Sequence, residues 1–189
     1  HIVAIGDSAL YNLNGGNGYN TAVGSKSMFS TTTGAYNVAL GNYSLFFNTT
    51  GHSNTAIGVS ALFKNITGIR NTASGLYAMS ENTTGSNNTV AGSYALSENT
   101  TGSNNTAYGY NTMPLNLSGS SNIAIGSNTM FANSTGSNNI GIGNYALNTN
   151  TDKNNLIAIG DSALFNNGTG ATLFSHAINN TAIGVATLK

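Results

Sequence analysis

Residues 54–70 read NTAIGVSALFKNITGIR, and almost the whole 189-residue chain consists of further copies of this unit. Each copy has a glycine that closes an Ala-Ile-Gly step, and this landmark glycine recurs with a constant 17-residue period from Gly24 to Gly160. The interval before that run is longer by one position, and the interval after it is longer by seven. The landmark glycines are Gly6, Gly24, Gly41, Gly58, Gly75, Gly92, Gly109, Gly126, Gly143, Gly160 and Gly184. A strict period of this length predicts a stack of similar coils.

Positions within the unit, numbered from the landmark glycine, indicate what each coil requires. Position +4 is always Leu or Met, position −1 is usually Ile, Val or Leu, position −2 is mostly small, and position −3 is β-branched. β-Branched residues that alternate with small ones favour a strand, so Thr-Ala-Ile-Gly predicts one strand and residues 60–63 predict a second. The Asn-rich segment at 82–88 predicts the return turn, because Gly and Asn tolerate positive φ.

These features predict an all-β fold: a parallel β-solenoid of about eleven 17-residue coils, each with two short strands. At a strand spacing of about 4.8 Å, the stack would be about 50 Å long. Residues 1–189 form a single repeat domain, and the long last interval predicts an inserted loop at 171–178. Both ends fall inside a repeat, so we interpret the chain as a piece of a longer one. The predicted structural core consists of residues at −1 and +4, among them Ile57, Leu62, Ile125, Met130, Ile142, Leu147, Ile159 and Leu164.

Charge and composition exclude several classes of function. Five basic and five acidic residues give a net charge of zero, so the sequence argues against nucleic acid as a partner and against polybasic membrane contact. The chain has no cysteine, which excludes disulfides and thiolate metal sites. No apolar run approaches the roughly 18 residues of a membrane-spanning helix. Charged residues are only 5% of the chain, so its polar surface must come from Asn, Ser and Thr.

Self-association is expected because one Ile and one Leu per coil is little apolar burial for the number of residues that each coil must order. Aromatic residues recur at position +5 and at position +2, and exposed apolar stripes usually mark an interface. The alternative is that these aromatic side chains cover strand edges within one chain. The +5 set is Tyr11, Phe29, Phe46, Phe63, Phe131 and Phe165, and the +2 set is Tyr43, Tyr77, Tyr94 and Tyr145.

Catalytic and metal-binding chemistry have little support in the sequence, which predicts no enzyme, no metal and no cofactor. Glu81 and Glu98 share position +6 in adjacent coils, a spacing that resembles a retaining glycosidase pair. However, residues 80–89 and 97–106 are identical, so duplication of the segment explains the pair. His52 and His176 have no acid or second histidine in a metal-ligand spacing.

Two features are candidates for ligand binding. Ladders of hydroxyl and amide groups would stack in consecutive coils and present repeating polar groups to a glycan, a protein or an ice lattice. The alternative is that the ladders satisfy each other's hydrogen bonds in the turns. The inserted loop, with Phe174 and His176, is the second candidate, since loops on a regular scaffold often carry function. The ladder residues are Thr55, Thr72, Thr89, Thr106, Asn65, Asn82, Asn99 and Asn116.

The units NTAIG at 54–58 and NIAIG at 122–126 resemble the head repeat of the trimeric autotransporter adhesins, also called YadA-like repeats. The resemblance extends along the whole chain, once per coil. It implies a left-handed parallel β-roll, three of which pack side by side as a homotrimer. The family's repeat is commonly shorter than the unit found here, and similar Asn-rich repeats occur in phage tail fibres and large bacterial surface proteins.

The function implied by this resemblance is that of an extended extracellular element on a bacterial cell surface or a virion fibre. Such an element adheres to a host or cell surface, through a glycan or a matrix protein, or acts as a rigid spacer. The residues leave open a different function, an ice- or lattice-binding solenoid that uses the stacked Thr and Asn ladders.

Overall fold

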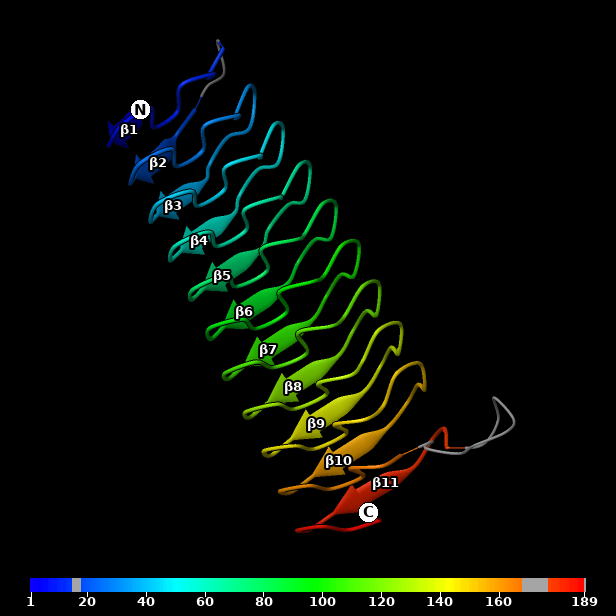
Figure 1. Ribbon diagram of the computed structural model, residues 1–189. Helices are drawn as coiled ribbons and strands as arrows, with labels where there is room; N and C mark the ends of the chain where they lie inside the picture. Colours follow the sequence, from blue (N-terminus) through cyan, green and yellow to red (C-terminus); the bar gives the residue numbers. More distant parts are fainter. Residues whose placement is uncertain (15–17, 168–176, 189) are drawn as a thin grey trace.

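The computed structural model describes residues 1–14, 18–167 and 177–188. Within these ranges it contains eleven short strands and no helix, so no segment there forms a helix able to cross a membrane (Figure 1). The strands are β1 (Ile2–Ile5), β2 (Asn20–Val23), β3 (Val38–Leu40), β4 (Thr55–Ile57), β5 (Thr72–Ser74), β6 (Thr89–Ala91), β7 (Thr106–Tyr108), β8 (Ile123–Ile125), β9 (Ile140–Ile142), β10 (Ile157–Ile159) and β11 (Thr181–Ile183).

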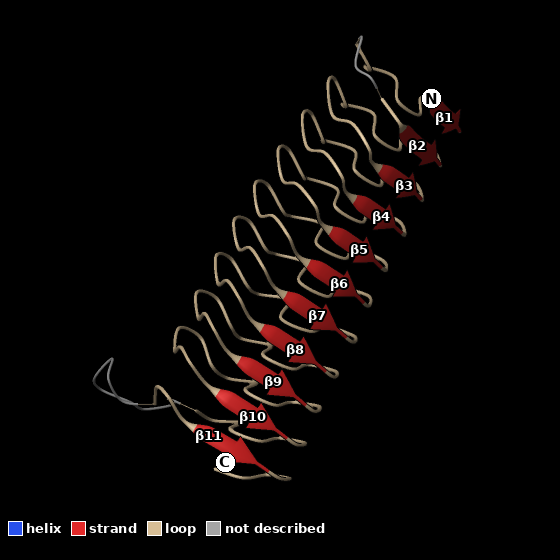
Figure 2. Ribbon diagram, turned by 180° about the vertical axis from the view of Figure 1, so that it is seen from behind, coloured by secondary structure: helices blue, strands red, loops and turns tan. Residues whose placement is uncertain are grey.

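All eleven strands belong to one parallel sheet whose spatial order is the order of the chain, β1 to β11. Each strand pairs with the equivalent residues of the next coil, so that Thr55 lies beside Thr72 and Ala56 beside Ala73. The sheet runs along one side of the stack and the loops along the other (Figure 2). The prediction of an all-β, parallel solenoid with one coil for each sequence repeat is confirmed.

Each coil contains one strand, so the prediction of a second strand at residues 60–63 is wrong. Ser60 and Leu62 take left-handed φ values of 55° and 52°, which break the extended backbone. The N–H of Ala61 donates to Gly58 O over 3.3 Å, and the N–H of Asn65 donates to Leu62 O over 3.1 Å. These bonds close two successive turns around an inward-pointing leucine. A narrow coil has to reverse its direction here, and an extended segment would not do so.

The left-handed residues recur at +2, +4 and +12 along the stack, mostly as residues other than glycine. Such a conformation costs about 1–2 kcal/mol per residue. Hydrogen bonds between coils hold it in place: the N–H of Ser60 donates to Asn42 O over 2.9 Å, and that of Leu62 donates to Ala78 O over 3.0 Å. Backbone strain within a coil is therefore offset by contacts with the coils on either side.

Two glycines in most coils are required by close approach, and the described exception is Lys153 at +10 in the coil of β9. Gly58 has a φ of +126°, and a Cβ added there would lie 2.5 Å from Gly75 O of the next coil. Gly68, at position +10, has no room either, because an added Cβ would overlap Gly85 O and the side chain of Asn65. A side chain added at Gly58 or Gly68 would overlap the next coil unless the backbone shifted.

The apolar core is a narrow column of residues from positions −2, +3 and +4. Position +4 supplies its large side chains, and the predicted core residues Leu62, Met130, Leu147 and Leu164 are buried as expected. Position −2 supplies alanine from the strand, and Ala56 is fully buried. Alanine at +3, as at Ala61, fills the space between them.

The isoleucines at −1 are not part of this core, which corrects the prediction for four residues. Ile57 and Ile125 are 41% and 40% exposed, and Ile142 and Ile159 are half-buried. Side chains alternate between the two faces of a strand, so when alanine at −2 points inward, −1 and −3 must point outward. The narrow interior has room for alanine on this wall and not for isoleucine. The outer face of the sheet therefore carries most of the exposed large aliphatic side chains of the strands.

Candidate functional site

The asparagines at position +7 form a ladder inside the stack. Asn65, Asn82, Asn99 and Asn116 are all 0% exposed. Each side-chain amide donates to the side-chain carbonyl of the preceding asparagine, over 2.7 Å from Asn82 to Asn65. It also donates to the glycine at +10 of its own coil, over 3.0 Å from Asn82 to Gly85 O. The prediction that these four residues bind a ligand is wrong, because their amides are enclosed and already bonded.

A second asparagine ladder, at position −4, was not predicted. Asn54, Asn71 and Asn88 are fully buried just before their strands. The Asn54 side chain donates to Gly68 O over 2.9 Å and accepts the backbone N–H of Asn71 over 2.9 Å. The regular recurrence of Asn before the strand was a visible signal. The two ladders converge on one carbonyl, since Gly68 O also accepts from Asn65 over 3.0 Å.

The threonines at −3 lie on the outer face of the sheet. Thr72 and Thr89 are exposed, and Thr55 and Thr106 are half-buried. The parallel register places all four in consecutive coils. Of the predicted ligand-binding residues in the described ranges, these threonines are the ones that reach solvent.

The aromatic residues at +5 form a stack at the N-terminal end. The rings of Tyr11, Phe29, Phe46 and Phe63 follow one another at centroid distances of 5.3, 5.2 and 5.4 Å. Their faces stack along the axis, and Tyr11 at the end of the stack is 70% exposed. Stacking of this kind stabilises successive coils within one chain.

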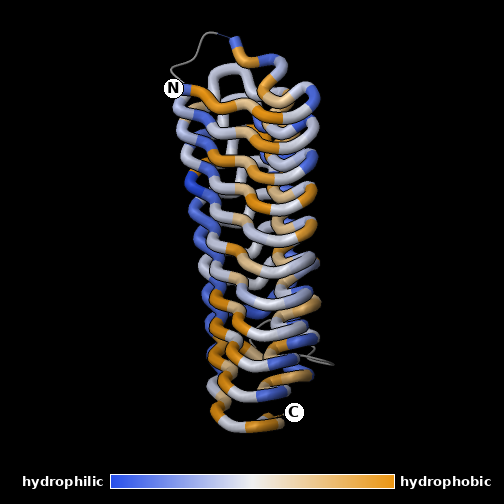
Figure 3. Tube along the Cα trace, turned by 90° about the vertical axis from the view of Figure 1, so that its left-hand side faces the viewer, coloured by the Kyte–Doolittle hydropathy of each residue, from blue (hydrophilic) through white to orange (hydrophobic). Residues whose placement is uncertain are grey.

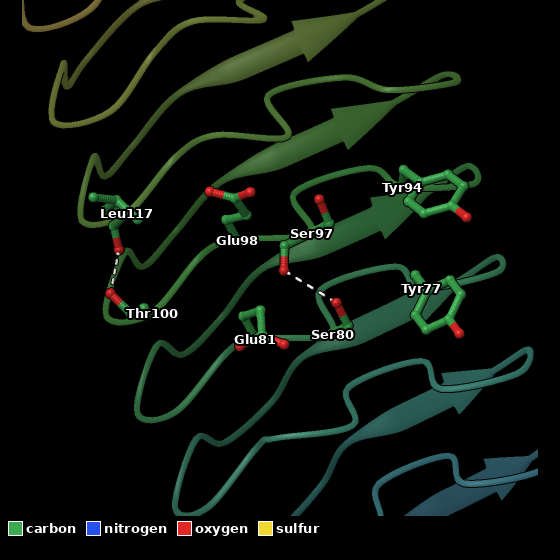
Figure 4. A pocket seen from close by; sticks show the side chains of 8 residues that line it. All are labelled: Tyr77, Ser80, Glu81, Tyr94, Ser97, Glu98, Thr100 and Leu117. Atoms are coloured by element: carbon green, nitrogen blue, oxygen red, sulfur yellow. Dashed lines mark hydrogen bonds between the residues drawn. The ribbon is translucent and has the colours of Figure 1, made fainter.

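The stack of +5 rings ends at Phe63, because the next two coils have Ser80 and Ser97 at this position. An open groove of about 660 Å³ lies where further rings would continue the stack. Figure 4 shows the two serines lying between a pair of tyrosines and a pair of glutamates. The residues that line the groove are Tyr77, Ser80, Glu81, Tyr94, Ser97, Glu98, Thr100 and Leu117. The groove follows from the sequence directly, because two small residues replace the phenylalanines of the preceding coils.

The walls of the groove combine aromatic and anionic groups. Tyr77 and Tyr94 stack with a centroid distance of 5.5 Å, and each is 40% exposed. Glu81 forms an ion pair with Lys64 of the preceding coil. Glu98 is exposed, and its carboxylate has no ion pair or hydrogen bond with the described residues. At the floor, the Ser80 hydroxyl donates to Ser97 O over 3.3 Å.

The structure brings Glu81 and Glu98 to the same groove, on equivalent positions of adjacent coils. A glycosidase needs one protonated and one ionised carboxyl group, with environments that separate their pKa values. Here both carboxylates are solvent-accessible, and Glu81 is paired with Lys64. Within the described ranges, no group of three or more His, Asp or Glu residues is placed to hold a metal ion.

The remaining candidates lie apart from the groove or outside the described residues. His52 is half-buried, and its Nδ1 lies 3.3 Å from the Ser53 hydroxyl. Phe174, His176 and most of the predicted inserted loop fall outside the described ranges. Comparison of the chain with protein-family models, with curated proteins and with solved structures finds no match.

Proposed function

We propose that this chain is a structural and adhesive segment of an extracellular fibre on a bacterial cell surface or a virion. The observation that carries the proposal is the unbroken parallel register from β1 to β11, which gives a rod whose length is set by the number of coils. The likeness of its unit to adhesin head repeats supports the same function.

A side-by-side homotrimer is part of this proposal, with the outer face of the sheet as the contact surface. Leu40, Ile57, Ile123 and Ile125 are between 37% and 41% exposed on that face. Figure 3 shows hydrophobic residues on the strand side of the column. Covering a half-exposed isoleucine contributes on the order of 1 kcal/mol, and the repeat multiplies that gain along the rod.

The mass in solution tests the assembly. Light scattering coupled to size-exclusion chromatography is expected to give three times the chain mass of 19.2 kDa. A mass equal to one chain would contradict the trimer. Adhesion is tested separately with arrays of glycans and matrix proteins, where binding supports the adhesive role and its absence leaves the spacer role.

A second candidate function, binding to ice or another lattice, is favoured by one observation. Thr55, Thr72, Thr89 and Thr106 lie in consecutive register on the open face of the sheet. Such a row presents hydroxyl and methyl groups at the strand spacing of about 4.8 Å. Thermal hysteresis at high protein concentration tests it, and freezing without hysteresis would exclude ice binding.

A further inference from the structure

Two intramolecular contacts show how this surface holds an ammonium group. At position +6, the Lys64 ammonium pairs with the Glu81 carboxylate one coil further along. At position +2, the Lys26 ammonium lies 5.6 Å from the centroid of the Tyr43 ring, also one coil further along. Both contacts fit recognised modes of cation binding, a charge-assisted hydrogen bond and a cation–π contact.

The coil of β6 contributes the same two kinds of cation acceptor to its half of the groove, a tyrosine ring and a carboxylate. Tyr94 occupies the same position as Tyr43, and Glu98 occupies the same position as Glu81. The neighbours of Glu98 at +6 are Glu81 and Leu115, and those of Tyr94 at +2 are Tyr77 and Asn111. No Lys or Arg stands at an adjacent equivalent position.

We propose that this half-groove binds an alkylammonium group, with its charge at Glu98 and its alkyl chain along Tyr94. The hollow between the two side chains exists because Ser97 replaces the +5 phenylalanine (Figure 4). An alkyl chain packs on the apolar surface of a tyrosine while its ammonium head stays in water near the carboxylate. The chain carries only five acidic and five basic side chains, so little other charge competes for the cation.

The ammonium group has two possible sources, a lysine side chain of a peptide or a free diamine. The recognition chemistry is the same for both. A lysine brings one ammonium on a tethered chain, whereas a diamine brings two and can move along the groove. Titration with each probe distinguishes them.

The test is a titration of the isotope-labelled protein with 1,5-diaminopentane and with N-acetyl-lysine amide, followed by amide chemical shifts. Shifts are expected at Tyr94, Ser97 and Glu98, with millimolar dissociation constants, since one exposed ion pair and one cation–π contact each contribute little. Tighter binding of the diamine identifies a free amine, tighter binding of N-acetyl-lysine amide identifies a lysine side chain, and no response to either would overturn the proposal. The uncharged 1,5-pentanediol is the matched control, and an equal response to it would overturn the proposal.

Three substitutions sharpen the test. Glu98→Gln is expected to weaken binding at least threefold, and Ser97→Phe, which restores the ring found in earlier coils, is expected to abolish it. Asp161→Asn removes a distant charge and should leave binding unchanged. Wild-type binding by Glu98→Gln would contradict the proposed site, even if the protein binds amines elsewhere.

Removal of the internal cation gives an independent prediction. Lys64→Met frees Glu81 beside Tyr77, so the groove should then bind a second ammonium group, with new shifts at Tyr77 and Glu81. If Lys64→Met leaves the number of bound ammonium groups and the set of shifted residues unchanged, then an external ammonium group does not take the place of the Lys64 side chain, and this prediction is wrong. Circular dichroism checks that each variant retains the fold.

Discussion

The coils of β5 and β6 differ from those of β8, β9 and β10 on the outside and hardly at all on the inside. On the outer sheet face, β5 presents Thr72 and Ser74, where β9 presents Ile140 and Ile142. Both regions keep a buried Leu or Met at +4 and a buried asparagine at +7, and the interior differences are confined to single positions such as Leu156, which replaces the −4 asparagine in the coil of β10. Packing between coils therefore constrains the interior and leaves the outer face free to vary.

If the chains associate as proposed, this difference gives the two regions separate tasks. In the proposed assembly the isoleucine-rich face of β8 to β10 is the contact between chains. The strands of the middle coils present Thr72, Ser74, Thr89 and Ala91 instead, and the column is paler there (Figure 3). The groove with Ser80 and Ser97 lies in the same middle coils. Assembly and recognition can then occupy different coils of one rod.

The largest expected effect tests whether the two interiors are equivalent. Leu96→Ala in the middle and Leu147→Ala in the C-terminal region each remove a fully buried side chain. Each is expected to lower the free energy of unfolding by about 3 kcal/mol, because the close-packed column cannot collapse onto the cavity. Urea unfolding at one fixed protein concentration measures both. A difference of more than twofold between the variants would show that the interiors are not equivalent.

The asparagine ladder is expected to have the next largest effect. Asn82→Ala and Asn133→Ala each leave the neighbouring asparagines and one glycine carbonyl with a lost bond inside the stack. A loss of about 2 kcal/mol is expected in both regions, since buried polar groups without partners are costly.

The control for the ladder is Thr84→Ala, which changes an exposed residue of the same turn. Its effect should stay within about 0.5 kcal/mol. If Asn82→Ala is as mild as this control, the ladder does not stabilise the stack, and its regularity needs another explanation.

The sequence was sufficient to predict the stack, since a 17-residue period with a constant Leu or Met allows few other folds. It was not sufficient to tell which strand residues point inward. Side chains alternate between the two faces of a strand, so either −2 or −1 can face the core, and the prediction chose the larger side chain at −1. The variation in side-chain size at −1 distinguishes the two possibilities. Ser74, Ala91 and Tyr108 all occur at this position, and a core position would not accommodate such different sizes. Position −2 keeps small residues almost throughout, as a narrow interior requires.

The asparagine ladders and the groove show how far the sequence alone predicts the candidate site. At +7 the structure has the arrangement that the sequence offered as the alternative, in which stacked asparagine amides satisfy each other's hydrogen bonds. The groove depends on a difference between coils, Ser80 and Ser97 where Phe63 stood before. An average over the repeats hides such a difference, which becomes visible when the coils are compared one by one.

An intermediate effect is expected on the outer face. The double variant Ile140→Thr with Ile142→Ser gives β9 the residue types of β5, and should weaken self-association about tenfold, as the loss of roughly 1.4 kcal/mol of apolar contact implies. Sedimentation over a concentration series measures this change. Thr72→Ser in β5 is the matched control and should leave association unaltered. Equal effects in both regions would mean that the isoleucine-rich face is not the contact between chains.

The smallest expected effect is that of Lys64→Met on stability. Lys64 and Glu81 retain 47% and 39% of their side-chain exposure, so water screens the ion pair. Such pairs contribute about 0–1 kcal/mol, and the free energy of unfolding should fall by less than about 1 kcal/mol. Thermal or urea unfolding at low and at high salt measures this, and the small difference should shrink as salt increases. A loss comparable to that of Leu96→Ala would make the pair a structural element of the middle coils. A small loss leaves Glu81 free to exchange its partner, as binding of an external ammonium group in this groove requires.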